Sequence, residues 1–405
     1  MNRFLARAVT AVMVAALLFP VDAEAISAEK SILLDANTGR VLYAQNADSR
    51  SLIASTTKIM TALVVSEQCN VLDRVRIPKE AVGIEGSSMY LQEGEVLTVQ
   101  ELLYGLMLRS GNDAAVALAI YCGGTVEGFA GLMNDKAALL ELDGTHFVNP
   151  HGLDAPGHYS CASDLATLAA YAMNNPIFAM TVSTKTVTIG DRSLRNHNKL
   201  LWQLDGAEGV KTGYTKAAGR ILVSSVMRQG RRLVAVTINA PDDWNDHKWL
   251  MEKGFSGFSL KQIVSAGDVL GSVEVSGGQA GCVELIANSD FSYALAPEEK
   301  ITLELPGVGF VYAPVKAFDD AGFVFYFLHR GFGSDDHITH TLAGNASIFC
   351  NLSQREILVI IKIEEFFLPV CEEFSVKIEE HSHTISLIFH GIAPFCKALY
   401  LYNSN

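Results

Sequence analysis

The sequence predicts an α+β fold: an antiparallel sheet packed with helices plus a mainly helical subdomain, followed by a small C-terminal all-β domain. Short apolar runs at residues 31–35 and 41–44 flank an Asn/Gly turn and indicate a β-hairpin. Residues 95–175 are mostly helical by their apolar periodicity. A second hairpin is expected over residues 219–240. Because strands precede and follow the helices, we expect one sheet that joins both ends of this segment.

The composition is that of a globular protein. The chain has 405 residues, of which 49% are hydrophobic and 19% charged, and this length is sufficient for two or three domains. The formal net charge of -13 argues against nucleic acid as a partner, because nucleic acids require a basic face. No polybasic stretch is present that would bind anionic lipid.

Residues 1–25 have the pattern of a secretory signal peptide. Arg3 and Arg7 supply the positive region, residues 8–21 the apolar core, and Ala23-Glu24-Ala25 a small-x-small cleavage site. The apolar core is shorter than the roughly 20 residues of a membrane-spanning helix. We therefore expect an exported, extracytoplasmic protein, in the cell wall or on the periplasmic side of the cytoplasmic membrane.

Helices are expected in a regular series through the first domain. A capping box formed by Thr98 and Glu101 marks the start of one of them, and a late helix follows Trp244 and ends near Phe255. The remaining helices are expected directly after Ser55 and over residues 98–108, 113–121, 129–140 and 164–173.

The mature chain is predicted to have three parts. Residues 26–256 form the α+β domain, and residues 257–325 form a small β-rich domain. Residues 326–405 are left unassigned: this tail, rich in Ile, Phe and Cys, is a β-rich extension or the product of a shifted reading frame. Strand patterns beyond the first domain lie at residues 269–275, 301–305, 357–363 and 374–389.

Cysteines and histidines predict neither a disulfide framework nor a metal site. The seven cysteines are few and scattered, and an odd number leaves at least one thiol free. His381 and His383 lack companion ligands at metal spacing, and we interpret them as surface histidines. No cofactor is expected. The cysteines are Cys69, Cys122, Cys161, Cys282, Cys350, Cys371 and Cys396.

Ser55-Thr56-Thr57-Lys58 lies where a loop becomes an apolar helical run. A helix that begins near Ser55 places Ser55 and Lys58 one turn apart on one face. A serine hydroxyl becomes a good nucleophile when a neighbouring base takes its proton, and a desolvated lysine can be that base. Ser27-Ala28-Glu29-Lys30 repeats the pattern in a polar stretch, and we interpret that copy as chance.

Two further patterns follow in order, Ser110-Gly111-Asn112 and Lys211-Thr212-Gly213. Alone, the first would be a turn between helices and the second a surface β-bulge. Their conjunction with Ser55-x-x-Lys58 reverses that interpretation, because three ordered motifs rarely coincide by chance. The three together resemble the penicillin-binding, active-site-serine peptidases.

Longer stretches narrow the resemblance to the low-molecular-weight D-alanyl-D-alanine carboxypeptidases. It covers about residues 27–256 strongly and the sequence to about residue 320 weakly. The similar stretches are Gly86-Ser87-Ser88-Met89, Leu108 to Ala114, Asn149 to Asp154 and Gly209 to Thr215. The resemblance implies a β-lactamase/DD-peptidase-like fold and a serine-type carboxypeptidase that removes the terminal D-alanine from peptidoglycan pentapeptide stems.

The resemblance also implies a role for each motif residue. Ser55 attacks the carbonyl of the D-Ala-D-Ala bond and forms an acyl-enzyme, and β-lactams inhibit by the same acylation. Lys58 takes the proton of Ser55, the second cation Lys211 lowers the pKa of Lys58, and Ser110 passes the proton to the leaving D-alanine. Asn112 holds Lys58 and a substrate amide.

The remaining implied roles concern substrate binding. Lys211 and Thr212 receive the terminal carboxylate, and Gly213 lets the extended substrate lie against the strand. The oxyanion is expected to bind the backbone N–H groups of Ser55 and Tyr214. His151 is left outside the catalytic set as a core histidine.

Two departures from the wider family are visible. Some relatives have an arginine after the strand hairpin that binds the carboxylate, whereas residues 241–247 contain none here, so recognition is expected to rest on Lys211 and Thr212. Many relatives end in an amphipathic anchoring helix, and residues 391–405 lack that periodicity. Membrane association is therefore left open.

Two alternative functions were weighed. A class A β-lactamase shares the fold but has Ser-Asp-Asn as its second motif, and it carries a deacylating glutamate for which we find no clear equivalent. A non-catalytic penicillin-binding wall sensor is expected to have lost one of Ser55, Lys58 or Lys211, and all three are present. An endopeptidase acting on cross-links uses the same mechanism and stays open.

Overall fold

The computed structural model describes residues 26–276, 282–287 and 289–304, together with five short strands beyond them. The expected signal peptide and the expected strand at 374–389 lie outside the described residues. The chain divides into two compact units. The described part of the first comprises residues 26–266 and 289–299, and that of the second comprises residues 267–276 and 282–287 and the strands from Lys300 onward.

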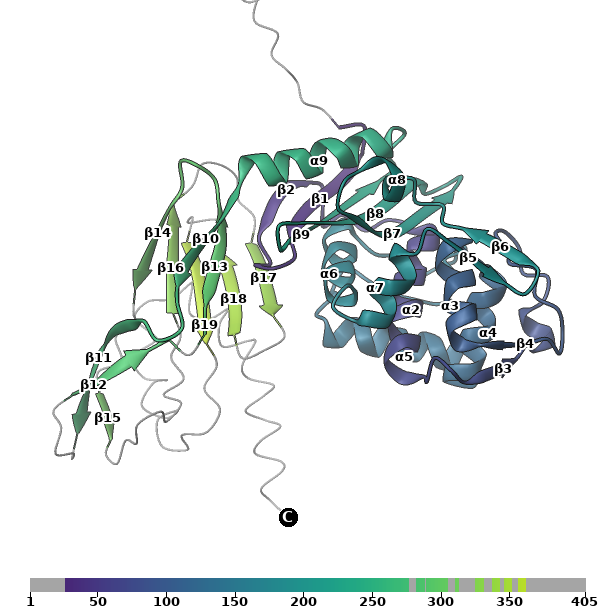
Figure 1. Cartoon of the computed structure of the whole chain (residues 1–405), viewed down its shortest axis with the longest axis horizontal. Coiled ribbons are helices and arrows are strands. Elements are labelled where there is room, and N and C mark those ends of the chain that lie inside the picture. The colour runs from purple at the N-terminus through teal and green to yellow at the C-terminus, as the bar shows by residue number, and fades with distance from the viewer. Residues whose placement is uncertain are drawn as a thin grey trace, which may run out of the picture. The chain divides into compact units, whose positions relative to one another are not determined.

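The first unit contains one five-stranded antiparallel sheet (Figure 1), in which the order is β2-β1-β9-β8-β7. Strand β1 from the N-terminal hairpin pairs with β9 from the late hairpin along its whole length, so the expected union of the two ends of the segment is confirmed. The strands are β1 (Lys30–Asp35), β2 (Val41–Gln45), β7 (Ala207–Thr215), β8 (Gly219–Arg228) and β9 (Arg231–Ile238).

Alternation along these strands gives the sheet two apolar faces. One face packs against α9 (Asp243–Gly257), which lies along the sheet in Figure 1. Its core consists of Leu33, Leu42, Val226, Leu233, Ala235, Leu250, Met251 and Ala294. Residues at the alternate strand positions, such as Ile32 and Val234, face the other side of the sheet and belong to the larger core that it shares with the helices. The predicted α+β class is confirmed.

The helical subdomain has the expected helices and some additional elements. The capping box of Thr98 and Glu101 is formed at the start of α3. A 3₁₀ turn, η1, precedes α2, and α7 was missed although Asn175 caps it and Pro176 is its first residue. The elements are η1 (Ala54–Thr57), α2 (Lys58–Gln68), α3 (Val99–Leu108), α4 (Asn112–Gly123), α5 (Val126–Leu139), α6 (Ala162–Ala172), α7 (Pro176–Ser183) and α8 (Leu200–Gln203).

Small two-stranded sheets and a short 3₁₀ turn complete the first unit. They are β3 (Arg74–Arg76) with β4 (Val96–Thr98), β5 (Thr186–Ile189) with β6 (Arg192–Arg195), β10 (Ser259–Val264) with β13 (Phe291–Leu295), and η2 (Lys79–Ala81). Among the described helices none alone is long and apolar enough to cross a bilayer. Helices α4 and α5, bent by 82° at their junction, meet that length and composition test as a pair.

The described strands of the second unit form two sheets, and the strand patterns expected at 269–275, 301–305 and 357–363 each contain a strand. One sheet consists of β11 (Val269–Ser276), β12 (Cys282–Ile286) and β15 (Phe310–Tyr312). The other consists of β14 (Lys300–Glu304), β16 (Phe325–Arg330), β17 (His337–Leu342), β18 (Ala346–Asn351) and β19 (Glu356–Ile361).

Candidate active site

Ser55 and Lys58 lie where η1 passes into α2. Ala54, the residue before Ser55, has a φ of 45°, in the left-handed region that non-glycine residues rarely adopt. The turn brings the Lys58 ammonium within 3.0 Å of the Ser55 hydroxyl. The chance copy of the motif does not assemble in this way, because the Ser27 hydroxyl donates to Asp246 instead.

Lys58 is completely buried and makes two further hydrogen bonds. Its Nζ donates to the Asn112 side-chain oxygen over 2.7 Å and to the main-chain carbonyl of His151. Asn112 starts α4, and its Nδ2 donates to the Glu85 carbonyl. A Cβ at Gly86 would lie 2.8 Å from that Nδ2, which explains the glycine here.

The surroundings of Lys58 favour its neutral form. Burial is the main cause that lowers the pKa of Lys58 well below its usual value, and the charge of Lys211 is the second; Asp113 opposes both. Lys211, on β7, is also buried, and its desolvation lowers its pKa to about 7. Its Nζ donates to the Thr212 carbonyl over 2.8 Å. Lys211 is therefore close to losing its proton at neutral pH, and the surroundings of Lys58 shift that lysine in the same direction.

A cavity of about 330 Å³ opens beside this pair. Its lining includes five of the expected site residues, Ser55, Ser110, Thr212, Gly213 and Tyr214. The other three, Lys58, Asn112 and Lys211, are buried next to them. The structure thus brings all eight expected residues together around one cavity.

Ser110 lines the cavity with a backbone φ of 61°. Among the described contacts of the two lysines, none is to the Ser110 hydroxyl: Lys58 binds Ser55, Asn112 and His151, and Lys211 binds Thr212. The position of Ser110 suits contact with a bound substrate, and its role in proton transfer stays a prediction.

Strand β7 passes directly beside the serine. A Cβ at Gly213 would lie 3.3 Å from the Ser55 backbone nitrogen, so the glycine permits this close approach. Strand β7 is also the last in the sheet order, with β8 as its sheet neighbour. No described strand pairs with its other edge, which is the position that an added substrate strand would take.

Arg220 is a site residue that the sequence analysis missed. It lies on β8 opposite Tyr214 of β7, lines the cavity, and donates two hydrogen bonds to Asp243, of 2.7 and 2.9 Å. The expectation that recognition rests on Lys211 and Thr212 stays a prediction, and the structure adds to the same cavity an arginine from the neighbouring strand. Counting the hairpin register back from residues 216–218 would have placed Arg220 across from Tyr214.

The comparisons with known proteins agree with this geometry. A family model described as D-alanyl-D-alanine carboxypeptidase matches residues 18–242, more than half of the chain. The chain belongs to the D-alanyl-D-alanine carboxypeptidase family. Members of this family are serine peptidases of the penicillin-binding class, so the carboxypeptidase described here is a serine-type hydrolase, as the three motifs predicted.

Curated relatives of this carboxypeptidase span most of its length. It is 34% identical to the D-alanyl-D-alanine carboxypeptidase DacF of Bacillus subtilis (strain 168) over 278 residues, which cover 65% of this chain and 72% of the relative. It is 33% identical to DacD of Escherichia coli (strain K12) over 349 residues, which cover 81% of this chain and 90% of the relative.

Solved structures extend the likeness to three dimensions. Penicillin binding protein 5 from Haemophilus influenzae superposes with a TM-score of 0.68 at 29% identity, covering 84% of this carboxypeptidase and 98% of that chain. The Streptomyces K15 DD-transpeptidase superposes with a TM-score of 0.55 at 36% identity, covering 57% of this carboxypeptidase and 98% of that chain. The predicted DD-peptidase-like fold is thereby confirmed.

Proposed function

We propose that the protein removes the terminal D-alanine from peptidoglycan stems that end in D-Ala-D-Ala, through an acyl-enzyme on Ser55. The observation that carries this proposal is the contact between the Ser55 hydroxyl and the buried Lys58, in a cavity beside an edge strand. Because peptidoglycan lies outside the cytoplasm, the proposal includes an extracytoplasmic location for this protein. The similarity to a penicillin-binding protein supports the same location.

The hydrogen bonds of Lys58 explain how it acts as a base. A neutral amine has two N–H groups and one lone pair. The Asn112 oxygen and the His151 carbonyl accept the two N–H groups, and the lone pair then faces the Ser55 hydroxyl at 3.0 Å. Lys58 takes the proton as Ser55 Oγ bonds to the substrate carbonyl carbon.

Charge on the substrate is met from two sides of the cavity. The developing oxyanion accepts hydrogen bonds from the backbone N–H groups of Ser55 and Tyr214. Thr212 and Arg220 bind the terminal carboxylate, and the buried charge of Lys211 adds to their field. Asp243 accepts its two hydrogen bonds from the Arg220 Nη2, and in this proposal the Nη1–H groups donate to the carboxylate. Ser110 donates its hydroxyl proton to the departing D-alanine amine and takes in exchange the proton that Lys58 received from Ser55.

Mass spectrometry after labelling with penicillin tests the nucleophile. The penicilloyl group is expected on the proteolytic peptide that contains Ser55, and purified protein is expected to release D-alanine from a peptide ending in D-Ala-D-Ala. Ser55→Ala is expected to abolish both. Labelling of Ser55→Ala at the normal rate, or on the peptide containing Ser27, would refute the proposal.

The rival β-lactamase activity requires a carboxylate that activates water beside the ester. Among the described residues that line the cavity, Asp243 is the one carboxylate, and it is engaged by Arg220. We therefore expect the penicilloyl ester to persist while the ester from the peptide turns over. Losing one positioned general base costs about 10²–10⁴-fold in rate. Rapid penicillin hydrolysis without release of D-alanine would assign the protein to the β-lactamases.

A further inference from the structure

Two helices of the catalytic centre meet again at their opposite ends. Helix α2 begins at Lys58 and α4 begins at Asn112, and the hydrogen bond between these two side chains joins the helix starts. Cys69 caps the end of α2, where its N–H donates to the Val65 carbonyl. Cys122 lies in the last turn of α4. Each helix thus carries a catalytic residue at one end and a thiol at the other.

The two thiols lie close enough for each to shift the pKa of the other, although they are far apart in the sequence. Cys122 Sγ also lies 3.7 Å from Oε1 of Gln68, the residue before Cys69. Both cysteines are partly buried, packing against the core with one side accessible to solvent. The fold thus brings two free, partly exposed thiols to the same end of α2 and α4, a placement that can lead to a disulfide.

We propose that Cys69 and Cys122 form a disulfide bond when the protein is in an oxidising compartment. The bond would join the far ends of α2 and α4, whose near ends carry Lys58 and Asn112. The oxidant is a second disulfide, on a small molecule or an oxidoreductase, such as is present where exported proteins fold.

The exchange proceeds in two balanced steps. The Cys122 thiolate attacks one sulfur of the oxidant, forming a mixed disulfide and expelling one thiolate. Cys69 then loses its proton and attacks Cys122 Sγ, expelling the second thiolate. Two protein thiols are oxidised, and the oxidant disulfide is reduced to two thiols.

The order of these steps follows from the contact between the sulfurs. The hydrogen bond from Cys69 lowers the pKa of Cys122, against the effect of burial. The same hydrogen bond, followed by burial, raises the pKa of Cys69. Cys122 is therefore the first nucleophile, since the thiolate is the reactive form.

A disulfide between Cys69 and Cys122 closes the chain between them into a loop. Such a loop restricts the unfolded chain and typically stabilises a protein by several kcal/mol. For a domain of this size, the expected rise in Tm is roughly 5–15 °C. The catalytic residues lie at the opposite ends of both helices, so the rate of penicillin acylation is expected to change by less than about two-fold.

The test uses the full chain, incubated with oxidised glutathione or kept reduced with a phosphine. Digestion without reductant, followed by mass spectrometry, is expected to yield a linked peptide pair containing Cys69 and Cys122 in the oxidised sample. The oxidised protein is expected to melt at the higher temperature. Cys69→Ser and Cys122→Ser should melt like the reduced protein under both conditions.

The matched control is Cys282→Ser, which removes an exposed thiol and is expected to keep the redox-dependent rise in Tm. The mapping of the unaltered chain does not depend on any variant folding. Recovery of Cys69 and Cys122 as separate alkylated or glutathionylated peptides after prolonged oxidation would overturn the proposal. So would a Tm of the oxidised protein equal to that of the oxidised Cys69→Ser variant.

Discussion

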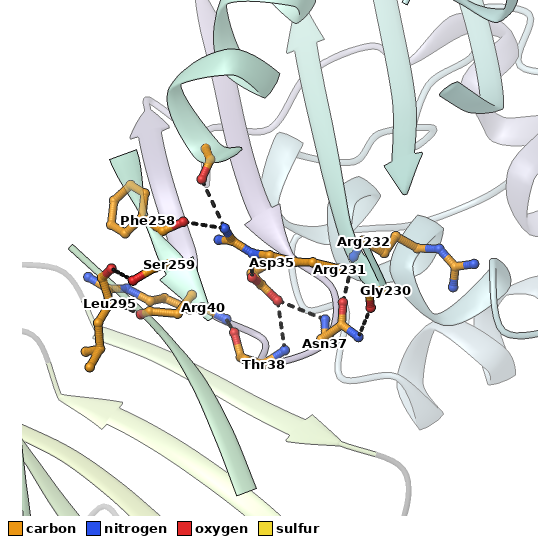
Figure 2. A network of polar contacts seen from close by, with 12 residues as sticks. Asp35, Asn37, Thr38, Arg40, Gly230, Arg231, Arg232, Phe258, Ser259 and Leu295 are labelled. Carbon is orange, nitrogen blue, oxygen red and sulfur yellow. Dashed lines mark hydrogen bonds and ion pairs between the residues drawn. The ribbon is translucent and has the colours of Figure 1, made fainter. Parts of the chain in front are cut away.

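The first unit holds two buried clusters of charge that are built in opposite ways. In the catalytic cluster, Lys58 and Lys211 are buried cations whose described side-chain hydrogen bonds go to neutral oxygens. In the second cluster, drawn in Figure 2, buried Arg231 is paired with buried Asp35 over 2.6 Å. Both clusters include residues of the same sheet, and both remove lysine or arginine from water.

The paired cluster holds three segments of the chain together. Asp35 Oδ1 accepts hydrogen bonds from the backbone of Asn37 and Thr38 in the β1–β2 turn. Arg231, at the start of β9, donates through Nη1 to the carbonyls of Gly254 and Phe258 at the end of α9. Figure 2 shows these contacts converging on the Asp35–Arg231 pair.

The difference teaches how a buried cation is used. A charge matched by a carboxylate keeps its proton and supports the structure, and removing one partner leaves the other uncompensated. A buried lysine without such a match is pushed toward its neutral form, which is the form that a general base needs. The contrast predicts that a mutation in the catalytic cluster lowers activity with little change in stability. A mutation in the paired cluster should lower stability with little change in activity.

The largest expected effect is on activity, from Lys58→Met in the catalytic cluster. Removing the base should slow acylation by penicillin by about 10²–10⁴-fold or more, while the midpoint of urea unfolding changes little, because a desolvated cation is also removed. Stopped-flow labelling and urea titration measure the two quantities. A variant that acylates normally, or that fails to fold, would contradict the comparison.

The next largest effect is on stability, from Asp35→Asn in the paired cluster. Leaving Arg231 unpaired in the interior should lower the free energy of unfolding by about 3–5 kcal/mol, and the protein that stays folded should acylate normally. Glu67→Gln is the control, since it breaks the more exposed pair of Glu67 with Lys136 and should cost at most about 1 kcal/mol. Equal losses in the free energy of unfolding from Asp35→Asn and Glu67→Gln would contradict a special role for the buried pair.

A third prediction concerns Arg220, which shares a feature with each cluster. Its guanidinium is paired with a carboxylate, Asp243, and it also lines the cavity. Arg220→Ala should lower kcat/KM by about 10–100-fold for a peptide with a free terminal carboxylate, from the loss of charge-assisted hydrogen bonds. A peptide amide should be affected much less. Arg220→Lys should lie between the two, since lysine keeps the charge without the planar fork. An identical loss on both peptides would argue against carboxylate binding.

The effect that is smallest per pH unit is a pH dependence of the free energy of unfolding from Lys211. Its pKa is about 7 when folded and about 10.4 when unfolded, so between these values the unfolded chain binds more protons. The contribution of Lys211 to the free energy of unfolding therefore rises with pH from about 7 to about 10.4, by at most about 1.4 kcal/mol per pH unit.

Lys211→Met should flatten the dependence in that window, as measured by urea unfolding at a series of pH values. The same variant removes a positive charge that lowers the pKa of Lys58. The acidic limb of the acylation rate should therefore move to higher pH. An unchanged slope together with an unchanged limb would show that Lys211 carries no unusual proton affinity.

Much of the site was predictable because its residues belong to short local sequence motifs. Ser55 and Lys58 are one helical turn apart, and the three ordered motifs indicated the family and the residues around the cavity. Short apolar runs around turns, before and after the helices, predicted that β1, β8 and β9 share one sheet. Helix α7, with its Asn-Pro start, carried a recognisable signal that was overlooked.

What the sequence by itself determined about this protein is therefore local: the family, the motif residues proposed as nucleophile and base, and the order of strands and helices. Tertiary structure alone decided which distant groups meet. The His151 carbonyl reaches Lys58, Arg220 enters from β8, and Cys69 contacts Cys122. The physical reason is that such contacts depend on strand register and on helix packing, which arise from the burial of the whole core and leave no short pattern along the chain.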